Sequence, residues 1–129
     1  MPESFDCYAY LTQVFAEFDR GDTLDVFIEN ARTNRKHELY FNYAVTCRIN
    51  DKLPEAFRVL EFIMEKYPDY KDAYHQLMNM YYTENRYDKL EELLFSWIAR
   101  NPDDSESVQL VDQLRQIQQS DDGPTRKLP

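Results

Sequence analysis

A 34-residue internal repeat is the feature that most constrains how this chain can fold. Residues 37–70 can be laid over residues 71–104 without a gap, and Pro68 then coincides with Pro102. Because proline cannot continue a helix, each of the two residues marks the end of a unit. Five further pairs are apolar or aromatic in both copies: Tyr40 with Tyr74, Tyr43 with Leu77, Cys47 with Tyr81, Leu60 with Leu94 and Ile63 with Trp97. Such a period indicates stacked units that bury their apolar faces against one another.

Each copy predicts two amphipathic helices joined by a turn. The apolar residues recur at steps of three and four, and a polar segment interrupts them once. The predicted turns are residues 50–52 and 84–86. We expect Asp51 and Asn85 to cap the helices that follow, since a side-chain oxygen there can accept from an unpaired backbone N–H. Pro54 fits the first turn of its helix, where a missing donor costs little.

The repeat extends less regularly on both sides. Residues 5–36 keep the internal spacing as a degenerate copy without the closing proline, with a turn at 19–22 and a linker at 33–36 that leaves it two residues short of the period. Residues 105–119 predict a capping helix, and residues 120–129 a disordered tail. We therefore expect a single domain over residues 1–119. The apolar positions of these flanks are Tyr8, Leu11, Phe15, Leu24, Ile28, Ala31, Leu110, Val111, Leu114 and Ile117.

These packing positions resemble those of the tetratricopeptide repeat (TPR) family over residues 37–104. The matching residues are Tyr40, Tyr43, Ala44, Cys47, Ala56, Leu60, Ile63 and Pro68, then Tyr74, Leu77, Tyr81, Leu94, Trp97 and Pro102. Met78 and Leu90 depart from the pattern, because the family has small residues where its helices approach most closely; wider helix spacing is expected there. The resemblance implies an all-α fold, a right-handed superhelix of stacked antiparallel helix pairs with a C-terminal capping helix.

Composition narrows the class of partner and the compartment. The chain has two glycines among 129 residues, which disfavours β-rich folds and phosphate-binding loops. Its formal charge of −9 disfavours nucleic acid and anionic membranes as partners. The first ten residues lack the pattern of a secretory signal and no stretch has the length of a membrane span, so a cytoplasmic protein is expected. Cys7 and Cys47 lie in apolar helical patterns and are expected to be buried free thiols.

The sequence offers no spacing that predicts catalysis. His37 and His75 are isolated, and no zinc-binding, phosphate-binding or nucleophile motif is present. Adjacent carboxylates on a helix point in different directions, so the acidic pairs are interpreted as solvated charges. The tripeptide Arg20-Gly21-Asp22 is interpreted as a turn and helix start. We therefore expect no enzyme activity, no cofactor and no metal.

The resemblance also implies where binding would occur. In this family the first helix of each repeat lines a concave groove, and the implied groove residues here are Tyr10, Gln13, Phe41, Asn42, Val45, Arg48, Ile49, His75, Gln76, Asn79 and Tyr82. For Phe41, Val45 and Ile49, packing against neighbouring helices or a terminal segment is the alternative role. Of the basic and amide residues with which one subfamily grips a C-terminal carboxylate, only Asn42 is matched, so a carboxylate clamp is not expected.

The expected function is therefore protein binding, as an adaptor or chaperone-like scaffold that holds a peptide or helix of a partner. Asp6, Glu17, Glu38 and Asp72 would border the groove, with Arg48 as its main cation, which favours a neutral or basic segment. Acidity that only keeps the protein soluble explains the same charges. The alternative is a structural subunit that forms homo-oligomers or stacks in a larger helical assembly. Exposed apolar surface on the end helices would favour this alternative.

Overall fold

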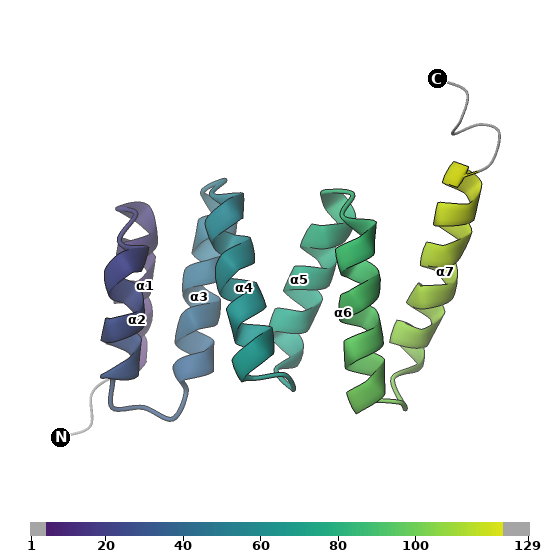
Figure 1. Ribbon diagram of the computed structural model, residues 1–129. Helices are drawn as coiled ribbons and strands as arrows, with labels where there is room; N and C mark the ends of the chain where they lie inside the picture. Colours follow the sequence, from purple (N-terminus) through teal and green to yellow (C-terminus); the bar gives the residue numbers. More distant parts are fainter. Residues whose placement is uncertain (1–4, 123–129) are drawn as a thin grey trace. The chain divides into compact units, whose positions relative to one another are not determined.

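Over residues 5–122, the part that the structure describes, the chain is all-α (Figure 1). This computed structural model confirms that the described part of the chain is all-helical, as predicted. The helices are α1 (Phe5–Glu17), α2 (Gly21–Glu29), α3 (Lys36–Ile49), α4 (Leu53–Lys66), α5 (Lys71–Thr83), α6 (Tyr87–Arg100) and α7 (Ser105–Asp122). Helix α7 thus includes the first three residues of the predicted tail, and residues 123–129 lie outside the described part.

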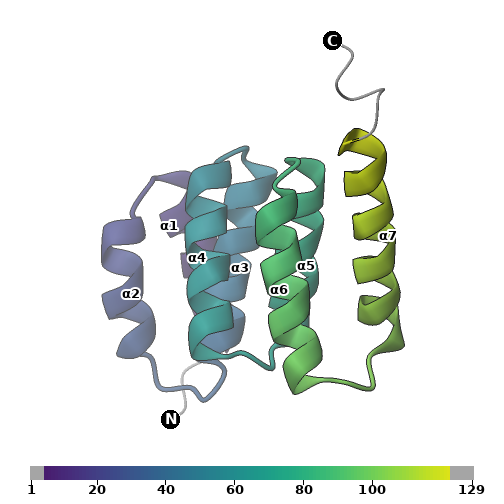
Figure 2. The same cartoon turned by 45° about the vertical axis from the view of Figure 1, so that its right-hand side comes forward.

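The helices form two compact units, residues 1–77 and 78–129, and α5 begins in the first and ends in the second. In the first unit, α1 packs against α2 and α3, and α3 packs against α4. Helices α1 and α3 form one layer of this unit and α2 and α4 the other (Figure 2). In the second unit, α6 packs against α7. In the first unit, short turns therefore join helices that pack against each other.

The three turns within the helix pairs have the same backbone geometry. Asp19, Asp51 and Asn85 all adopt positive φ, at 56°, 64° and 60°. After each of them the next residue donates its N–H to a carbonyl five positions back, as from Lys52 to Cys47 at 2.7 Å. This is the bond of the Schellman motif, which satisfies carbonyls at the end of the first helix. The turn residues are 32 and 34 positions apart, the two spacings that the sequence repeat predicts.

The predicted capping role of Asp51 and Asn85 is wrong. The residues that cap α4 and α6 are Lys52 and Arg86, and neither makes a side-chain capping bond. Asp51 and Asn85 close the preceding helix instead, because aspartate and asparagine tolerate the left-handed conformation better than other residues with a Cβ. In a chain with few glycines, these residues take the position that glycine usually fills.

The ends of α4 and α6 are equally alike. Tyr67 and Asn101, the residues before Pro68 and Pro102, have φ and ψ of −128° and 68° and of −132° and 68°. Their N–H groups bond to the carbonyls four residues back at 2.6 and 2.7 Å. A residue before proline is forced out of the helical region, so each helix stops at the same point of the repeat.

The core of each unit forms at the predicted packing positions. The fully buried residues of the first unit include Tyr40, Tyr43, Ala44, Cys47, Ala56, Leu60, Ile63, Tyr74 and Leu77. Those of the second include Tyr81, Leu90, Leu94 and Trp97. Leu11 and Cys7 are exceptions, because both are exposed on α1. The expectation of a buried Cys7 is therefore wrong, whereas Cys47 is buried as expected.

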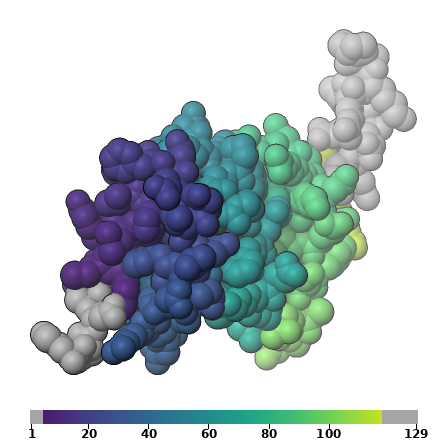
Figure 3. All heavy atoms as spheres, turned by 60° about the vertical axis from the view of Figure 1, so that its left-hand side comes forward, coloured from purple at the N-terminus to yellow at the C-terminus, as the bar shows by residue number. Residues whose placement is uncertain are grey.

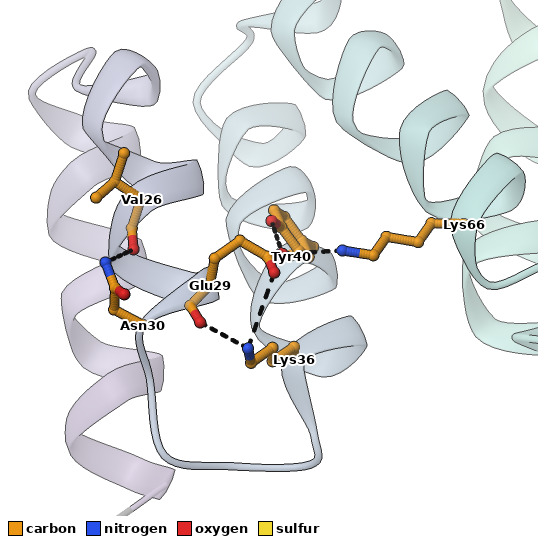
Figure 4. A network of polar contacts seen from close by, with 6 residues as sticks. All are labelled: Val26, Glu29, Asn30, Lys36, Tyr40 and Lys66. Carbon is orange, nitrogen blue, oxygen red and sulfur yellow. Dashed lines mark hydrogen bonds and ion pairs between the residues drawn. The ribbon is translucent and has the colours of Figure 1, made fainter.

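Buried tyrosine hydroxyls join the helices of the first unit through carboxylates. Tyr40 donates to Glu29 Oε2 at 2.8 Å, and Lys66 Nζ lies 3.0 Å from the same oxygen (Figure 4). Lys36 Nζ donates to the Glu29 carbonyl at 2.7 Å, so three helices meet at this residue. The bonds from Lys66 and then Tyr40 lower the pKa of the Glu29 carboxyl. Each hydroxyl buried in this way keeps an acceptor, which avoids the cost of an unpaired polar group.

A second bond between a buried tyrosine and a carboxylate lies beside the start of α2. Tyr43 donates to Glu55 Oε2 at 2.5 Å, and Arg58 binds the same carboxylate with two N–H groups. A Cβ at Gly21 would lie 2.6 Å from the Tyr43 hydroxyl and in contact with Glu55. Glycine therefore lets α2 begin directly against this pair. The tripeptide that contains Gly21 lies at the end of a turn and the start of a helix, where the sequence interpretation places it.

Candidate functional site

The second unit contains a cavity of about 220 Å³ between its helices. Its lining is mostly apolar, and the residues come from α5, α6 and α7: Met78, Asn79, Tyr82, Leu90, Leu94, Leu110, Gln113, Leu114 and Ile117. Leu90, Leu94 and Leu114 are buried and form the floor. The cavity thus lies where the apolar faces of three helix segments meet without filling the space between them.

Helical spacing explains why these side chains converge. Leu90 and Leu94 are one turn apart on α6, and Leu110, Leu114 and Ile117 follow one face of α7. Residues three or four positions apart lie above one another on a helix. The two leucines of α6 and the three α7 residues therefore face one another across the cavity.

Asp104 fixes the beginning of α7 beside α6. Its carboxylate accepts from the backbone N–H of Ser107 at 3.3 Å and from the Ser107 hydroxyl at 3.0 Å. It also accepts from the indole N–H of Trp97, a buried residue of α6, at 2.8 Å. A side chain that caps a helix and bonds to a neighbouring helix restricts both the start and the position of α7. Asp104 is therefore a positioning residue for one wall of the cavity.

Polar groups lie around the mouth of the cavity. Asn79 and Gln113 are exposed amides, and each carries both a donor and an acceptor. The Tyr82 side chain is half-exposed, and its ring centroid lies 6.1 Å from that of Tyr87. An apolar floor with amides at the rim can hold an apolar side chain while bonding to the backbone that carries it.

The size of the cavity indicates the class of ligand. Pockets for small molecules and cofactors usually start at roughly 300 Å³. A dry apolar cavity of about 150 Å³ accepts a single benzene ring. The present cavity, at about 220 Å³, fits one aromatic or branched aliphatic side chain better than a cofactor.

The predicted groove residues divide between the two units. Asn79 and Tyr82 belong to the second unit, and both line the cavity. The others belong to the first unit. Tyr10, Gln13, Ile49 and His75 are exposed, whereas Phe41, Asn42, Val45, Arg48 and Gln76 are half-buried.

Several of the first-unit residues have packing partners. The Phe41 ring meets the Tyr70 ring edge to face, with centroids 5.5 Å apart. Arg48 donates to the side-chain oxygen of Gln76, so the predicted cation is bound to a predicted amide. Phe41 and Arg48 therefore join α3 to the segment that leads into α5 and to α5 itself. The predicted groove residues of the first unit thus include both packed and exposed side chains.

Charged side chains lie near the N-terminal end of α3. Arg35 donates to both oxygens of Glu38 at 2.6 and 2.8 Å, and this pairing lowers the pKa of the Glu38 carboxyl. Burial raises the pKa of Tyr70 to about 12, and the charges of Asp72 and Glu38 add to the increase. Asp6 and Glu17 are exposed on α1. The first unit thus has two exposed carboxylates on α1 and, at the start of α3, a carboxylate that is already paired with Arg35.

The groove prediction missed most of the cavity lining. The sequence interpretation treats five of the lining residues as packing residues: Leu90, Leu94, Leu110, Leu114 and Ile117. An unfilled space between packing residues leaves no pattern in the sequence. A partial signal exists, because Met78 and Leu90 depart from the family pattern, and both line the cavity. Large side chains at positions where the family's helices approach most closely are the sequence feature from which the cavity could have been predicted.

A metal site, a membrane-spanning helix or a known relative would each narrow the function of this chain. Among residues 5–117, whose side chains the structure describes, no three His, Cys, Asp or Glu side chains are grouped so that they could hold a metal ion. None of the described helices has both the length and the hydropathy needed to cross a bilayer. Comparison of the chain with models of known protein families, with characterised proteins and with solved structures gives no match.

Proposed function

We propose that this chain is a TPR-like helical repeat protein that binds a segment of another protein. The proposal includes the right-handed superhelical stacking of its helix pairs. Support for the repeat comes from local geometry, since the turns at Asp51 and Asn85 and the helix ends at Tyr67 and Asn101 recur at the 34-residue period. Scaffolds of this kind use their helix faces to hold partners.

The observation that carries the binding function is the cavity of the second unit. A volume of about 220 Å³ with an apolar floor suits one large side chain of a peptide or helix. Asn79 and Gln113 at the mouth supply donors and acceptors for the partner backbone. Anchoring one apolar side chain in a pocket is how many peptide-binding proteins obtain affinity. The ligand would therefore be a peptide segment with an exposed aromatic or branched aliphatic residue.

Selection from a random peptide library displayed on phage tests this function. We expect the selected peptides to share one large apolar residue and to lose affinity about tenfold or more when that residue is replaced by alanine. Tyr82→Ala in the protein should weaken the same peptides, because its side chain lines the cavity. Tyr82 is 49% exposed, so the variant is expected to fold, which circular dichroism can verify.

Phe95→Ala is the matched control. Phe95 is also a half-exposed aromatic residue of the second unit, at 43%, but it does not line the cavity. Peptides that bind Phe95→Ala and wild type alike, but not Tyr82→Ala, would support the cavity as the site. Selection of no peptide, or equal loss in both variants, would contradict the proposal.

A further inference from the structure

Helix α1 carries an apolar stripe that the described residues leave uncovered. It consists of Cys7, Tyr10, Leu11, Val14 and Phe18, where Phe18 directly follows the helix. Tyr10, Leu11 and Phe18 are 65%, 38% and 70% exposed. Steps of three and four residues place all five on one side of the helix, over a length of about 16 Å. We refer to these five residues as the α1 stripe.

The α1 stripe is distinct from the face by which α1 joins the core. That face contains Tyr8, Thr12 and Ala16, which are all buried. Tyr8 and Phe15 contact the Phe27 ring of α2, with centroids 5.6 and 5.2 Å apart. Helix α1 is thus apolar on two sides, and only one of them is used within the unit. Figure 3 looks onto this α1–α2 side of the first unit, shown in purple.

The equivalent positions of α3 show what such a stripe does when it is covered. Leu39 and Tyr43 lie 32 residues after Cys7 and Leu11, at the spacing of the first two copies, and both are fully buried. The equivalents of Tyr10, Val14 and Phe18 are the polar residues Asn42, Thr46 and Asn50, which are not buried, so the second copy uses only part of this side for packing. In α1 the same side is hollowed around Asp6, Cys7, Tyr10 and Leu11 and open to solvent. A contiguous exposed apolar surface of this kind marks an interaction site.

Charge indicates which occupant suits the α1 stripe. Asp6 and Glu17 are 11 residues apart, about three turns, so both lie along the edge next to Tyr10. Helix α1 contains no lysine or arginine. An occupant with lysine or arginine along its border would meet complementary charge over the length of the stripe.

A second copy of the chain is a poor occupant by the same reasoning. Antiparallel pairing of two α1 helices would bring Asp6 of one copy towards Glu17 of the other, and each chain has a formal charge of −9. Like charges held together at an interface oppose binding. Anionic lipid would be repelled for the same reason.

We propose that the α1 stripe docks an amphipathic helix of a partner protein whose apolar face is bordered by lysine or arginine residues. The contact is helix against helix, with Tyr10 and Phe18 as the large anchoring side chains. This surface belongs to the first unit and is independent of the cavity in the second.

Two synthetic helical peptides with the same leucine face provide the probe, one bordered by lysines and the other by glutamates. Fluorescence anisotropy gives their affinities, and NMR titration shows which backbone amides respond. The lysine peptide should bind about tenfold or more tightly than the glutamate peptide and shift the amides of α1. Tyr10→Ala with Phe18→Ala should weaken the lysine peptide by about tenfold or more, whereas Phe95→Ala, at an exposed residue outside both the stripe and the cavity, should leave its affinity unchanged.

Reversing the charges at the border of the stripe tests the electrostatic contribution separately from the apolar contacts. Asp6→Lys with Glu17→Lys should reverse the preference between the two peptides while α1 amides still respond. Equal affinities for both peptides in wild type, or undiminished binding by the Tyr10 and Phe18 double variant with intact helicity, would overturn the proposal. A dimer in sedimentation velocity that the double variant abolishes would also overturn it, because a second copy would then occupy the stripe.

Discussion

Cys7 and Cys47 are both free thiols, but their surroundings differ. Cys7 is exposed on the α1 stripe, while Cys47 is buried in the core of the first unit. Burial raises the pKa of the Cys47 thiol, although a hydrogen bond with Tyr43 acts in the opposite direction. Because the thiolate is the reactive form, both exposure and pKa make Cys47 the less reactive residue.

Alkylation with iodoacetamide at neutral pH should therefore modify Cys7 first. We expect Cys47 to react at least about tenfold more slowly in the folded protein and to match an ordinary thiol only after unfolding. Mass spectrometry of peptides taken over time measures both rates. Cys7→Ser serves as the control, since the remaining slow phase must then be that of Cys47. Equal rates in the native protein would contradict the burial of Cys47.

Single residues also show where sequence reasoning is limited. The sequence predicts that Cys7 and Leu11 pack inside, because they share the helical spacing of Tyr8 and Phe15. Helix α1 has apolar residues on two sides, and periodicity alone does not indicate which side meets the core. Asp51 and Asn85 are a similar case, since the same residue types favour a helix start and a left-handed turn.

The sequence predicts the bounds of helices and turns more accurately than it predicts the burial of single residues. The three turns and the proline-terminated ends of α4 and α6 lie within one or two positions of those predicted, because backbone constraints at proline and at the turns act locally. The cavity depends instead on how closely α6 and α7 approach. That distance is set by the summed fit of many side chains, which the repeat pattern does not encode.

Asp104 offers a test at the scale of an element. Asp104→Ala should destabilise the second unit by about 1–2 kcal/mol, because α7 loses its capping bond and Trp97 loses its acceptor. Urea unfolding measures the change in free energy, and hydrogen exchange should show faster exchange in the first turns of α7. Asp103→Ala, at the exposed neighbouring position, is the matched control. An equal effect of both substitutions would mean that charge rather than capping is responsible.

At the scale of the molecule, buried tyrosines link stability to alkaline pH. Burial, followed by the bonds to Glu29 and Glu55, raises the pKa of Tyr40 and Tyr43 far above that of an exposed tyrosine. The pKa of Tyr70 is raised to about 12, mainly by burial. Above about pH 10 the unfolded chain loses these protons and the folded chain keeps them. The folded state then binds more protons, so its stability must fall as pH rises.

The free energy of unfolding should therefore be steady between about pH 7 and 8, begin to fall above about pH 8.5 because the buried Cys47 thiol keeps its proton, and fall more steeply above about pH 10. Each retained proton contributes a slope of about 1.4 kcal/mol per pH unit until its folded pKa is reached. Urea titrations followed by circular dichroism at several pH values measure the slope. Tyr40→Phe should reduce it by about one proton, and an unchanged slope in this variant would exclude Tyr40 as a source.

The connection between α2 and α3 has a consequence for how the protein can be divided. At six residues, 30–35, it is the longest link between consecutive described helices, and α2 has nine residues where α4 has fourteen. Arg32 and Arg35 in this link are both exposed. Trypsin should cut the native chain here, and a single cut would break the covalent link between the N-terminal hairpin and the remaining helices, while the packing of α1 against α3 would hold the two fragments together.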